Sequence, residues 1–206
     1  MNQDEVDKVF EQVDLSKPTG VRDLAIMHVA YATGLRRSEL CNLGLHSIDR
    51  YRGVITVRKG KGSKDRIVPI LDEAIAIVDE YVENHRPDPA PGHEDTLFLT
   101  IHGCRITENR MTQLVRDYIR AADIGDRGSC HAFRHSIATA MLDNGADLRH
   151  VQEQLGHADI STTQIYTQVS VAKLKEVHTA THPIARRRRR PADDRPTART
   201  RSPRKH

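Results

Sequence analysis

The chain has 206 residues, of which 37% are hydrophobic and 29% are charged, and its formal net charge is +4. This length suits one domain of ordinary size with a tail, and no apolar run approaches the roughly 20 residues that a membrane helix needs. The acidic start MNQDEVDKVF has no secretory signal pattern, and three scattered cysteines do not predict a disulfide framework. We therefore expect a cytoplasmic protein with no membrane partner.

The positive charge is concentrated at the C-terminal end. Nine Arg and one Lys against two Asp give residues 185–206 a formal charge of +8, which leaves −4 for residues 1–184. Nucleic-acid binding by the body of the protein must therefore be argued from local sites and not from net charge. The end of the chain is charged and almost free of apolar residues, so we predict a folded domain over 1–183 and a disordered tail over 184–206.

Most of the elements predicted along the chain are helices. Helical spacing of apolar residues predicts them at 4–14, 21–33, about 36–43, 72–85, 109–124, 131–144, 148–155, about 161–168 and 171–181. We expect Gly34 and Gly156 to end two of these helices and Asp147 to cap the start of another. Two β-branched runs within 53–70 predict an antiparallel hairpin, and TLFLT (96–100) predicts a short strand. The predicted fold class is mainly α with a small antiparallel β-sheet (α+β).

Two arginines occupy positions that favour an anion. Arg36 follows a helix-ending glycine at the entrance of the next helix, where backbone N–H groups attract negative charge, while its neighbour Arg37 should point elsewhere. In HAFRH, His131 and Arg134 lie within about 60° of each other on one helix. Arg134 borders the apolar stripe, so its guanidinium needs an anion. From each segment alone, an internal salt bridge for Arg134 and a solvated Arg36 are favoured over a bound phosphate.

Each of three further residues has either a purely structural or a functional interpretation. Lys61 is flanked by glycines in a protruding basic turn that either is simply solvated or enters a DNA groove; the spacing is not that of a Walker A loop. His157 follows a helix end, and Tyr166 comes nine residues later. A tyrosine has a pKa of about 10, so it packs at a core edge or is activated by nearby cations as a nucleophile.

The histidines also raise the question of a metal site. Cys130 and His131 are adjacent, and no HExxH pattern is formed by His131, His135, His150 and His157, while no CxxC pair occurs anywhere in the chain. We therefore predict no metal site.

The order and spacing of these segments carry more information than any one of them. The series YATGLRRSEL, GKGSKDRIVPI and HAFRHSIATAMLDNGADLRHVQEQLGHADISTTQIY resembles the catalytic domain of the tyrosine recombinase (phage integrase) family, in its Xer-like form, over about residues 4–183. The resemblance implies a site-specific recombinase or integrase of bacterial, nucleoid-associated type that needs neither a cofactor nor a metal. The implied catalytic set is Arg36, Lys61, His131, Arg134, His157 and the nucleophile Tyr166.

The implied reaction assigns each of these residues a role. Tyr166 would attack a scissile phosphate to give a 3′-phosphotyrosyl bond, and the two arginines would stabilise the charge of the transition state. Lys61 would protonate the leaving 5′ oxygen, His131 would assist proton removal from the tyrosine, and His157 would hydrogen-bond the phosphate.

The resemblance also implies partners. Double-stranded DNA would be the substrate, bound by a homo-tetramer in which the helix at about 171–181 docks on a neighbour, or by this chain with a longer partner recombinase. We expect the DNA backbone to be contacted by Lys59, Lys64, Arg66, Arg187 and Arg188.

One departure from the family leaves the function open. Family members usually carry an N-terminal clamp domain of about a hundred residues, and its absence from this chain would weaken DNA binding because fewer phosphates are contacted. The basic tail either compensates in part or is merely solvated. The alternatives to a recombinase are a truncated, non-catalytic DNA-binding or assembly module of the same fold, and a topoisomerase that relaxes DNA without exchanging strands.

Overall fold

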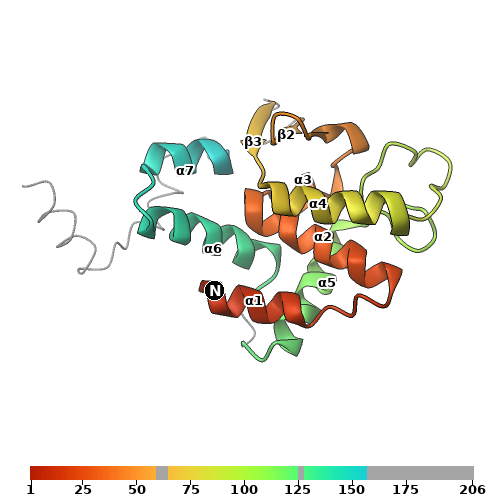
Figure 1. Cartoon of the computed structure of the whole chain (residues 1–206), viewed down its shortest axis with the longest axis horizontal. Coiled ribbons are helices and arrows are strands. Elements are labelled where there is room, and N and C mark those ends of the chain that lie inside the picture. The colour runs from red at the N-terminus through yellow and green to blue at the C-terminus, as the bar shows by residue number, and fades with distance from the viewer. Residues whose placement is uncertain (59–64, 125–127, 157–206) are drawn as a thin grey trace, which may run out of the picture. The chain divides into compact units, whose positions relative to one another are not determined.

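A computed structural model of the whole chain describes residues 1–58, 65–124 and 128–156 (Figure 1). The chain divides into two compact units, Met1–Gln168 and Val169–His206, and every described residue belongs to the first. The predicted helices at 161–168 and 171–181 and the predicted tail lie outside the described residues.

The described part of the chain consists of helices and a small sheet, with a long irregular connection over residues 86–107. The elements are α1 (Gln3–Glu11), α2 (Pro18–Thr33), α3 (Arg37–Cys41), a 3-10 turn (Leu45–Ser47), β1 (Ile48–Asp49), β2 (Val54–Val57), β3 (Arg66–Pro69), α4 (Asp72–Glu80), a π-helical turn (Tyr81–His85), α5 (Glu108–Ala121), α6 (Cys130–Asp143) and α7 (Leu148–Leu155). The predicted fold class, mainly α with a small antiparallel sheet, is confirmed.

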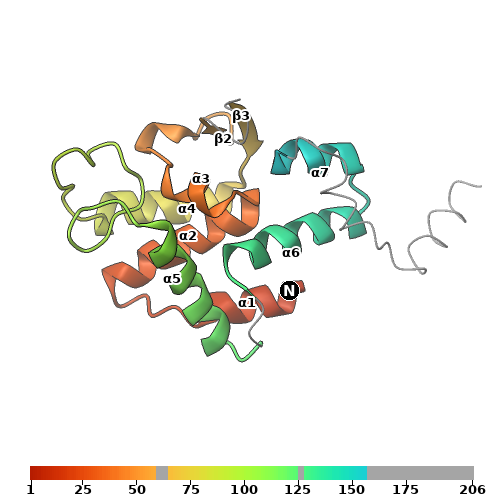
Figure 2. The same cartoon turned by 180° about the vertical axis from the view of Figure 1, so that it is seen from behind.

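Helix α2 is the central element of the core. It packs against α4 and α6 (Figures 1 and 2), and its side chains Ile26, Met27 and Val29 are fully buried. The helix ends as predicted at Gly34, whose φ of 63° is left-handed. Because glycine has no Cβ, it adopts this conformation at little cost and turns the chain toward α3.

The sheet has the order β1-β2-β3, and both pairs are antiparallel. Ile55 lies opposite Val68, and both are buried on the inner face, which contacts the core. Val57 lies opposite Arg66, so this arginine begins β3 at the edge next to the segment 59–64. The predicted hairpin is confirmed in its two strands, whereas the two-residue strand β1 was not predicted.

The prediction of a strand at TLFLT was wrong. Leu97, Phe98 and Leu99 are all buried, so the segment does not alternate between an inner and an outer face as a half-buried strand does. Only isolated bridges, at Thr96 and Leu99, join the segment to other extended backbone in the described residues. The Leu97 N–H donates to the carbonyl of Leu43 at 2.9 Å, and the Leu99 N–H donates to the Tyr81 hydroxyl at 3.2 Å. The segment is a buried extended connection whose partners come from elsewhere in the chain.

Helices α6 and α7 form a hairpin next to the core. Asp147 caps α7 by accepting a hydrogen bond from the Arg149 N–H at 2.7 Å, and α7 ends at Gly156 with a left-handed φ of 64°. Both features were predicted. Helix α7 packs on α6 and also contacts β3, so its C-terminal end lies beside the first residue of the hairpin's return strand.

Candidate active site

The site begins where the C-terminal ends of α2 and α7 meet. A Cβ placed on Gly34 would lie 2.6 Å from Leu155 Cδ2 and 3.2 Å from Ile137 Cγ2, so the approach itself requires a glycine. Arg134 is only 6% exposed and joins the two ends. Its Nη1 donates to the Gly34 carbonyl, and its Nη2 donates to the Leu155 carbonyl at 2.6 Å. The guanidinium from α6 therefore holds the ends of two other helices together.

Arg36, two residues after Gly34, contacts the same end of α7. Its Nη2 donates to the Gly156 carbonyl at 2.8 Å across a separation of 120 residues. Its Nη1 donates to Glu39 Oε1 at 3.0 Å, and its backbone N–H donates to Glu39 Oε2 at 2.8 Å. As predicted, Arg37 points elsewhere and forms an ion pair with Glu108 at 2.7 Å.

The two arginines thus satisfy consecutive carbonyls at the end of α7. The last carbonyls of a helix have no partner within it and carry the negative end of the helix dipole, so cations are favoured there. Leu155 accepts from Arg134, and Gly156 accepts from Arg36. A guanidinium has five N–H groups, and in the described residues Arg36 uses one on each of its terminal nitrogens. Arg36 therefore keeps donors for an external oxyanion.

Glu39 and Arg66 complete the cluster. Arg66 donates to both carboxylate oxygens of Glu39, from Nη1 to Oε1 at 2.7 Å and from Nη2 to Oε2 at 2.8 Å. Burial by itself would raise the pKa of Glu39, but the hydrogen bonds from Arg66 and from the Arg36 backbone outweigh it, and this pKa is lowered. Glu39 is therefore ionised at neutral pH.

Neither the role of Glu39 nor the pairing of Arg66 was predicted. Glu39 follows Arg36 by three residues, a spacing at which a helix brings two side chains together, and this signal in RRSEL would have identified it. Arg66 was expected to contact DNA, but both of its terminal nitrogens are engaged by a carboxylate and its side chain is only 14% exposed. The DNA contact of Arg66 stays a prediction, and among the described residues its guanidinium is bound to Glu39.

The remaining predicted residues are divided between the described and the undescribed parts. His131 is exposed in the first turn of α6, one turn before Arg134. The others lie outside the described residues: Lys59, Lys61, Lys64, His157, Tyr166, Arg187 and Arg188. Two described elements nevertheless adjoin these segments in the sequence: β3 begins just after 59–64, and α7 ends just before residue 157.

Two of the three cysteines, Cys41 and Cys130, are buried. Burial raises the pKa of Cys41 to about 11 and that of Cys130 to about 12, so both thiols stay protonated at neutral pH. Within residues 1–58, 65–124 and 128–156, no group of three His, Cys, Asp or Glu side chains could hold a metal ion. In the same part of the chain, no helix has the length and apolar character needed to span a membrane.

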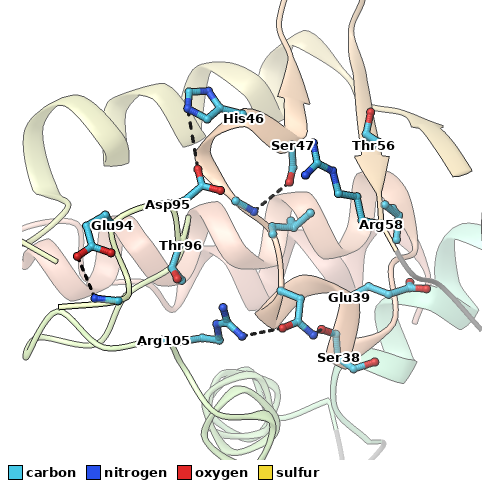
Figure 3. Close-up of a pocket in the computed structure, with 15 residues that line it drawn as sticks. Ser38, Glu39, His46, Ser47, Thr56, Arg58, Glu94, Asp95, Thr96 and Arg105 are labelled. Carbon is cyan, nitrogen blue, oxygen red and sulfur yellow. Dashed lines mark hydrogen bonds and ion pairs between the residues drawn. The ribbon is translucent and has the colours of Figure 1, made fainter. Parts of the chain in front are cut away.

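A polar groove of about 370 Å³ lies next to the cluster (Figure 3). Glu39 and Arg58 lie at one end of it, and Glu94 and Asp95 lie at the other. Arg105 lines the groove between them and donates to the Asn42 side-chain oxygen at 2.9 Å. The groove therefore brings one further cationic side chain, that of Arg58, next to the site, whereas its far end carries two carboxylates.

Comparison of the sequence with known proteins identifies the family of this chain. The profile of the Phage integrase family matches residues 1–173. The chain belongs to the Phage integrase family. It is 40% identical over 179 residues to tyrosine recombinase XerC 2 of Ralstonia nicotianae and 42% identical over 187 residues to tyrosine recombinase XerD of Listeria monocytogenes. These alignments cover 87% and 90% of this chain but only 52% and 63% of the two relatives.

A solved structure shares the fold of this family member. The XerH site-specific recombinase, bound to a palindromic difH substrate in a post-cleavage complex, superimposes with a TM-score of 0.73 at 27% identity. The match covers 87% of this chain and 52% of that one. The present chain thus corresponds to about half of XerH, and the shared part includes the helical and sheet framework described above.

Proposed function

We propose that this protein is the catalytic domain of a site-specific tyrosine recombinase, which cleaves and rejoins double-stranded DNA through a 3′-phosphotyrosyl intermediate. The observation that carries the proposal is the convergence of Arg36 and Arg134 on the carbonyls of Leu155 and Gly156. Those carbonyls immediately precede His157, and the nucleophile Tyr166 follows nine residues later. The post-cleavage complex of XerH with DNA supports the same reaction class.

The arrangement of the arginines suits phosphoryl transfer. Negative charge builds on the non-bridging oxygens of the scissile phosphate as Tyr166 attacks, and pre-positioned cationic donors stabilise that charge without reorganising. Arg36 and Arg134 are pre-positioned in this sense, because their guanidinium groups are already bound to main-chain carbonyls. Lys61 then protonates the leaving 5′ oxygen, and His131, exposed on α6, assists proton removal from the tyrosine.

Several basic side chains supply the DNA contacts. Arg58 and Arg105, which line the groove beside Glu39, are two of these side chains. The further contacts fall on Lys59 and Lys64 of the hairpin and on Arg187 and Arg188 of the tail. We assign the assembly to a homo-tetramer on DNA, with the segment 171–181 docking on a neighbour, or to a complex with a longer recombinase.

A covalent-capture experiment tests the reaction. The protein is incubated at low salt with a pool of nicked duplexes of randomised sequence, and protein–DNA adducts are isolated on a denaturing gel and sequenced. We expect adducts enriched in one sequence class, and none with Tyr166→Phe. If the wild-type protein binds the pool but forms no adduct, the second candidate, a non-catalytic DNA-binding module of the same fold, replaces the first.

The role of the tail is tested separately. Deleting residues 186–206 removes nine arginines and one lysine, so we expect weaker DNA binding and a shallower dependence of affinity on salt. The affinity of both proteins for the selected duplex is measured by fluorescence anisotropy between low and physiological salt. Equal affinities at low salt would show that the tail does not contact DNA.

A further inference from the structure

Arg66 contacts both Glu39 and the residue that ends α7. It binds both oxygens of Glu39, and its side chain lies directly against Gly156: a Cβ added there would fall 2.8 Å from Arg66 Nε and 2.9 Å from both Cδ and Cζ. Its Nε is buried and has no hydrogen-bond partner among the described residues. A buried N–H group without an acceptor destabilises the fold. The contacts with Glu39 and Gly156 therefore determine where the Arg66 side chain lies, at the cost of one missing hydrogen bond.

Arg66 also joins three segments that carry predicted catalytic residues. It begins β3, which follows the segment containing Lys61. Through Glu39 it is linked to Arg36 at the start of α3, and through Gly156 it contacts the residue that precedes His157. A displacement of Arg66 would therefore be felt in all three segments.

The charges in the cluster suggest what this link does. Glu39 orients Arg36 through two hydrogen bonds, yet one carboxylate beside one guanidinium would also cancel its charge. Glu39 is buried, so this cancellation would be only weakly screened by solvent. The second guanidinium, from Arg66, brings the three-residue cluster to a net charge of +1.

We propose that Arg66 is a positioning residue that balances Glu39, so that Glu39 orients Arg36 without reducing its attraction for the scissile phosphate. This inference rests on the proposed function and deepens it. It replaces the direct DNA contact expected of Arg66 by an indirect electrostatic role. If this inference holds, replacing Glu39 by a neutral residue should restore part of the reaction rate that is lost when Arg66 is replaced.

The test compares rates of adduct formation on the duplex selected by covalent capture. We expect Arg66→Met to slow the reaction by about 10- to 100-fold, by analogy with the loss of a residue that orients a metal ligand. Adding Glu39→Gln to Arg66→Met should recover part of the rate, because the uncompensated carboxylate is gone. Arg50→Met is the matched control, since Arg50 is paired with Asp79 on the surface and should leave the rate unchanged.

A second readout separates electrostatics from general damage. A methylphosphonate at the scissile position lacks one negative charge, so it depends less on the charge of Arg36. The penalty of Arg66→Met should therefore be smaller on the methylphosphonate than on the phosphate. DNA affinity is measured in the Tyr166→Phe background, which separates binding from chemistry.

The outcomes are distinct. A wild-type rate in Arg66→Met, or an equal penalty on both substrates with no recovery by Glu39→Gln, would overturn the inference. If Arg66→Met does not fold, Arg66→Lys decides: a rate within about tenfold of wild type supports charge balance, and a larger loss overturns it. A wild-type protein that forms no adduct would refute the proposed function itself.

Discussion

Two clusters of this protein bury arginines in different electrostatic settings. Arg22, in α2, is 7% exposed and lies against Asp23, with 2.6 Å between Nη2 and Oδ1, while its Nη1 donates to the Leu99 carbonyl at 3.1 Å. That cluster has one cation for one anion. At the candidate active site, Arg36 and Arg66 share the single carboxylate of Glu39. Burial of an arginine is therefore common to both clusters, and what sets the candidate active site apart is that two guanidinium groups share one carboxylate.

A tyrosine hydroxyl also binds the carboxylate of the Arg22 cluster. The Tyr118 hydroxyl of α5 donates to the second oxygen of Asp23 at 3.1 Å. Burial and the neighbouring Asp23 raise the pKa of Tyr118 to about 12, so it remains a donor at any physiological pH. The pair and the tyrosine hold α2 to α5, and their role is structural.

The largest effect that we expect comes from breaking this structural pair. Arg22→Met leaves the Asp23 carboxylate buried without its cation, which should lower the free energy of unfolding by about 3–5 kcal/mol. Adding Asp23→Asn should restore part of the loss, because the amide can still accept from Tyr118. Urea denaturation measures both. Loss of less than about 1 kcal/mol would show that the pair contributes no more than a surface salt bridge.

Replacing Arg36 should slow the reaction strongly and change the stability little, the opposite of what we expect for Arg22. Arg36→Met removes a pre-positioned donor, so we expect adduct formation to slow by about 10²–10³-fold. Its stability should change by only about 1 kcal/mol, since Glu39 keeps its bidentate pair with Arg66. The rate is measured on the selected duplex and the stability in urea. If Arg36→Met destabilised the protein as much as Arg22→Met, the distinction between the two clusters would collapse.

Gly156 offers a smaller and more local test. Gly156→Ala places a Cβ in a left-handed residue, at about 1–2 kcal/mol, and against the Arg66 guanidinium. Gly145→Ala is the control, because its φ of 90° is also positive but no atom lies within 4 Å of the added Cβ. We expect both variants to be destabilised in urea and only Gly156→Ala to lose adduct formation. Equal activity in the two would show that the contact with Arg66 does not affect the reaction.

The smallest effect concerns pH. Because the folded pKa of Glu39 lies below its ordinary value of 4.5, its contribution is present above that value and is lost as pH falls through the folded pKa. Glu39→Gln should therefore flatten the loss of stability below about pH 5, by at most about 1.4 kcal/mol per pH unit. Burial raises the pKa of Asp23, so its contribution has the opposite sign: it is lost as pH rises through the folded pKa. Urea titrations between pH 3 and 6 test whether Glu39→Gln and Asp23→Asn change the slope in opposite directions.

Local chemistry made the helix ends predictable. Gly34 and Gly156 could be placed because a helix commonly ends in a left-handed residue, and Asp147 because an aspartate caps a free N–H group. These choices depend on a few neighbouring residues. They also position the site, since Arg134 joins the ends of α2 and α7.

Contacts between distant segments were not predictable in the same way. Glu39 and Arg66 are 27 residues apart, and nothing in either segment indicates that the two charges neutralise each other instead of meeting solvent or DNA. The buried run at Leu97–Leu99 has the composition of a strand, but its backbone partners are Leu43 and a tyrosine hydroxyl. Hydropathy reports how much of a side chain is buried and not what lies against the backbone.

The anchors of the two arginines also have a consequence for sequence drift. Arg134 and Arg36 are held at α7 by main-chain carbonyl oxygens, and every residue type supplies such an oxygen. Position 155 can therefore exchange one apolar side chain for another without removing an acceptor, whereas positions 34 and 156 are restricted by the space around them. Variation among functional homologues should accordingly be confined to apolar side chains at residue 155, which is fully buried, and be narrowest at the two glycines, while the carbonyl acceptors themselves are kept whatever the side chain.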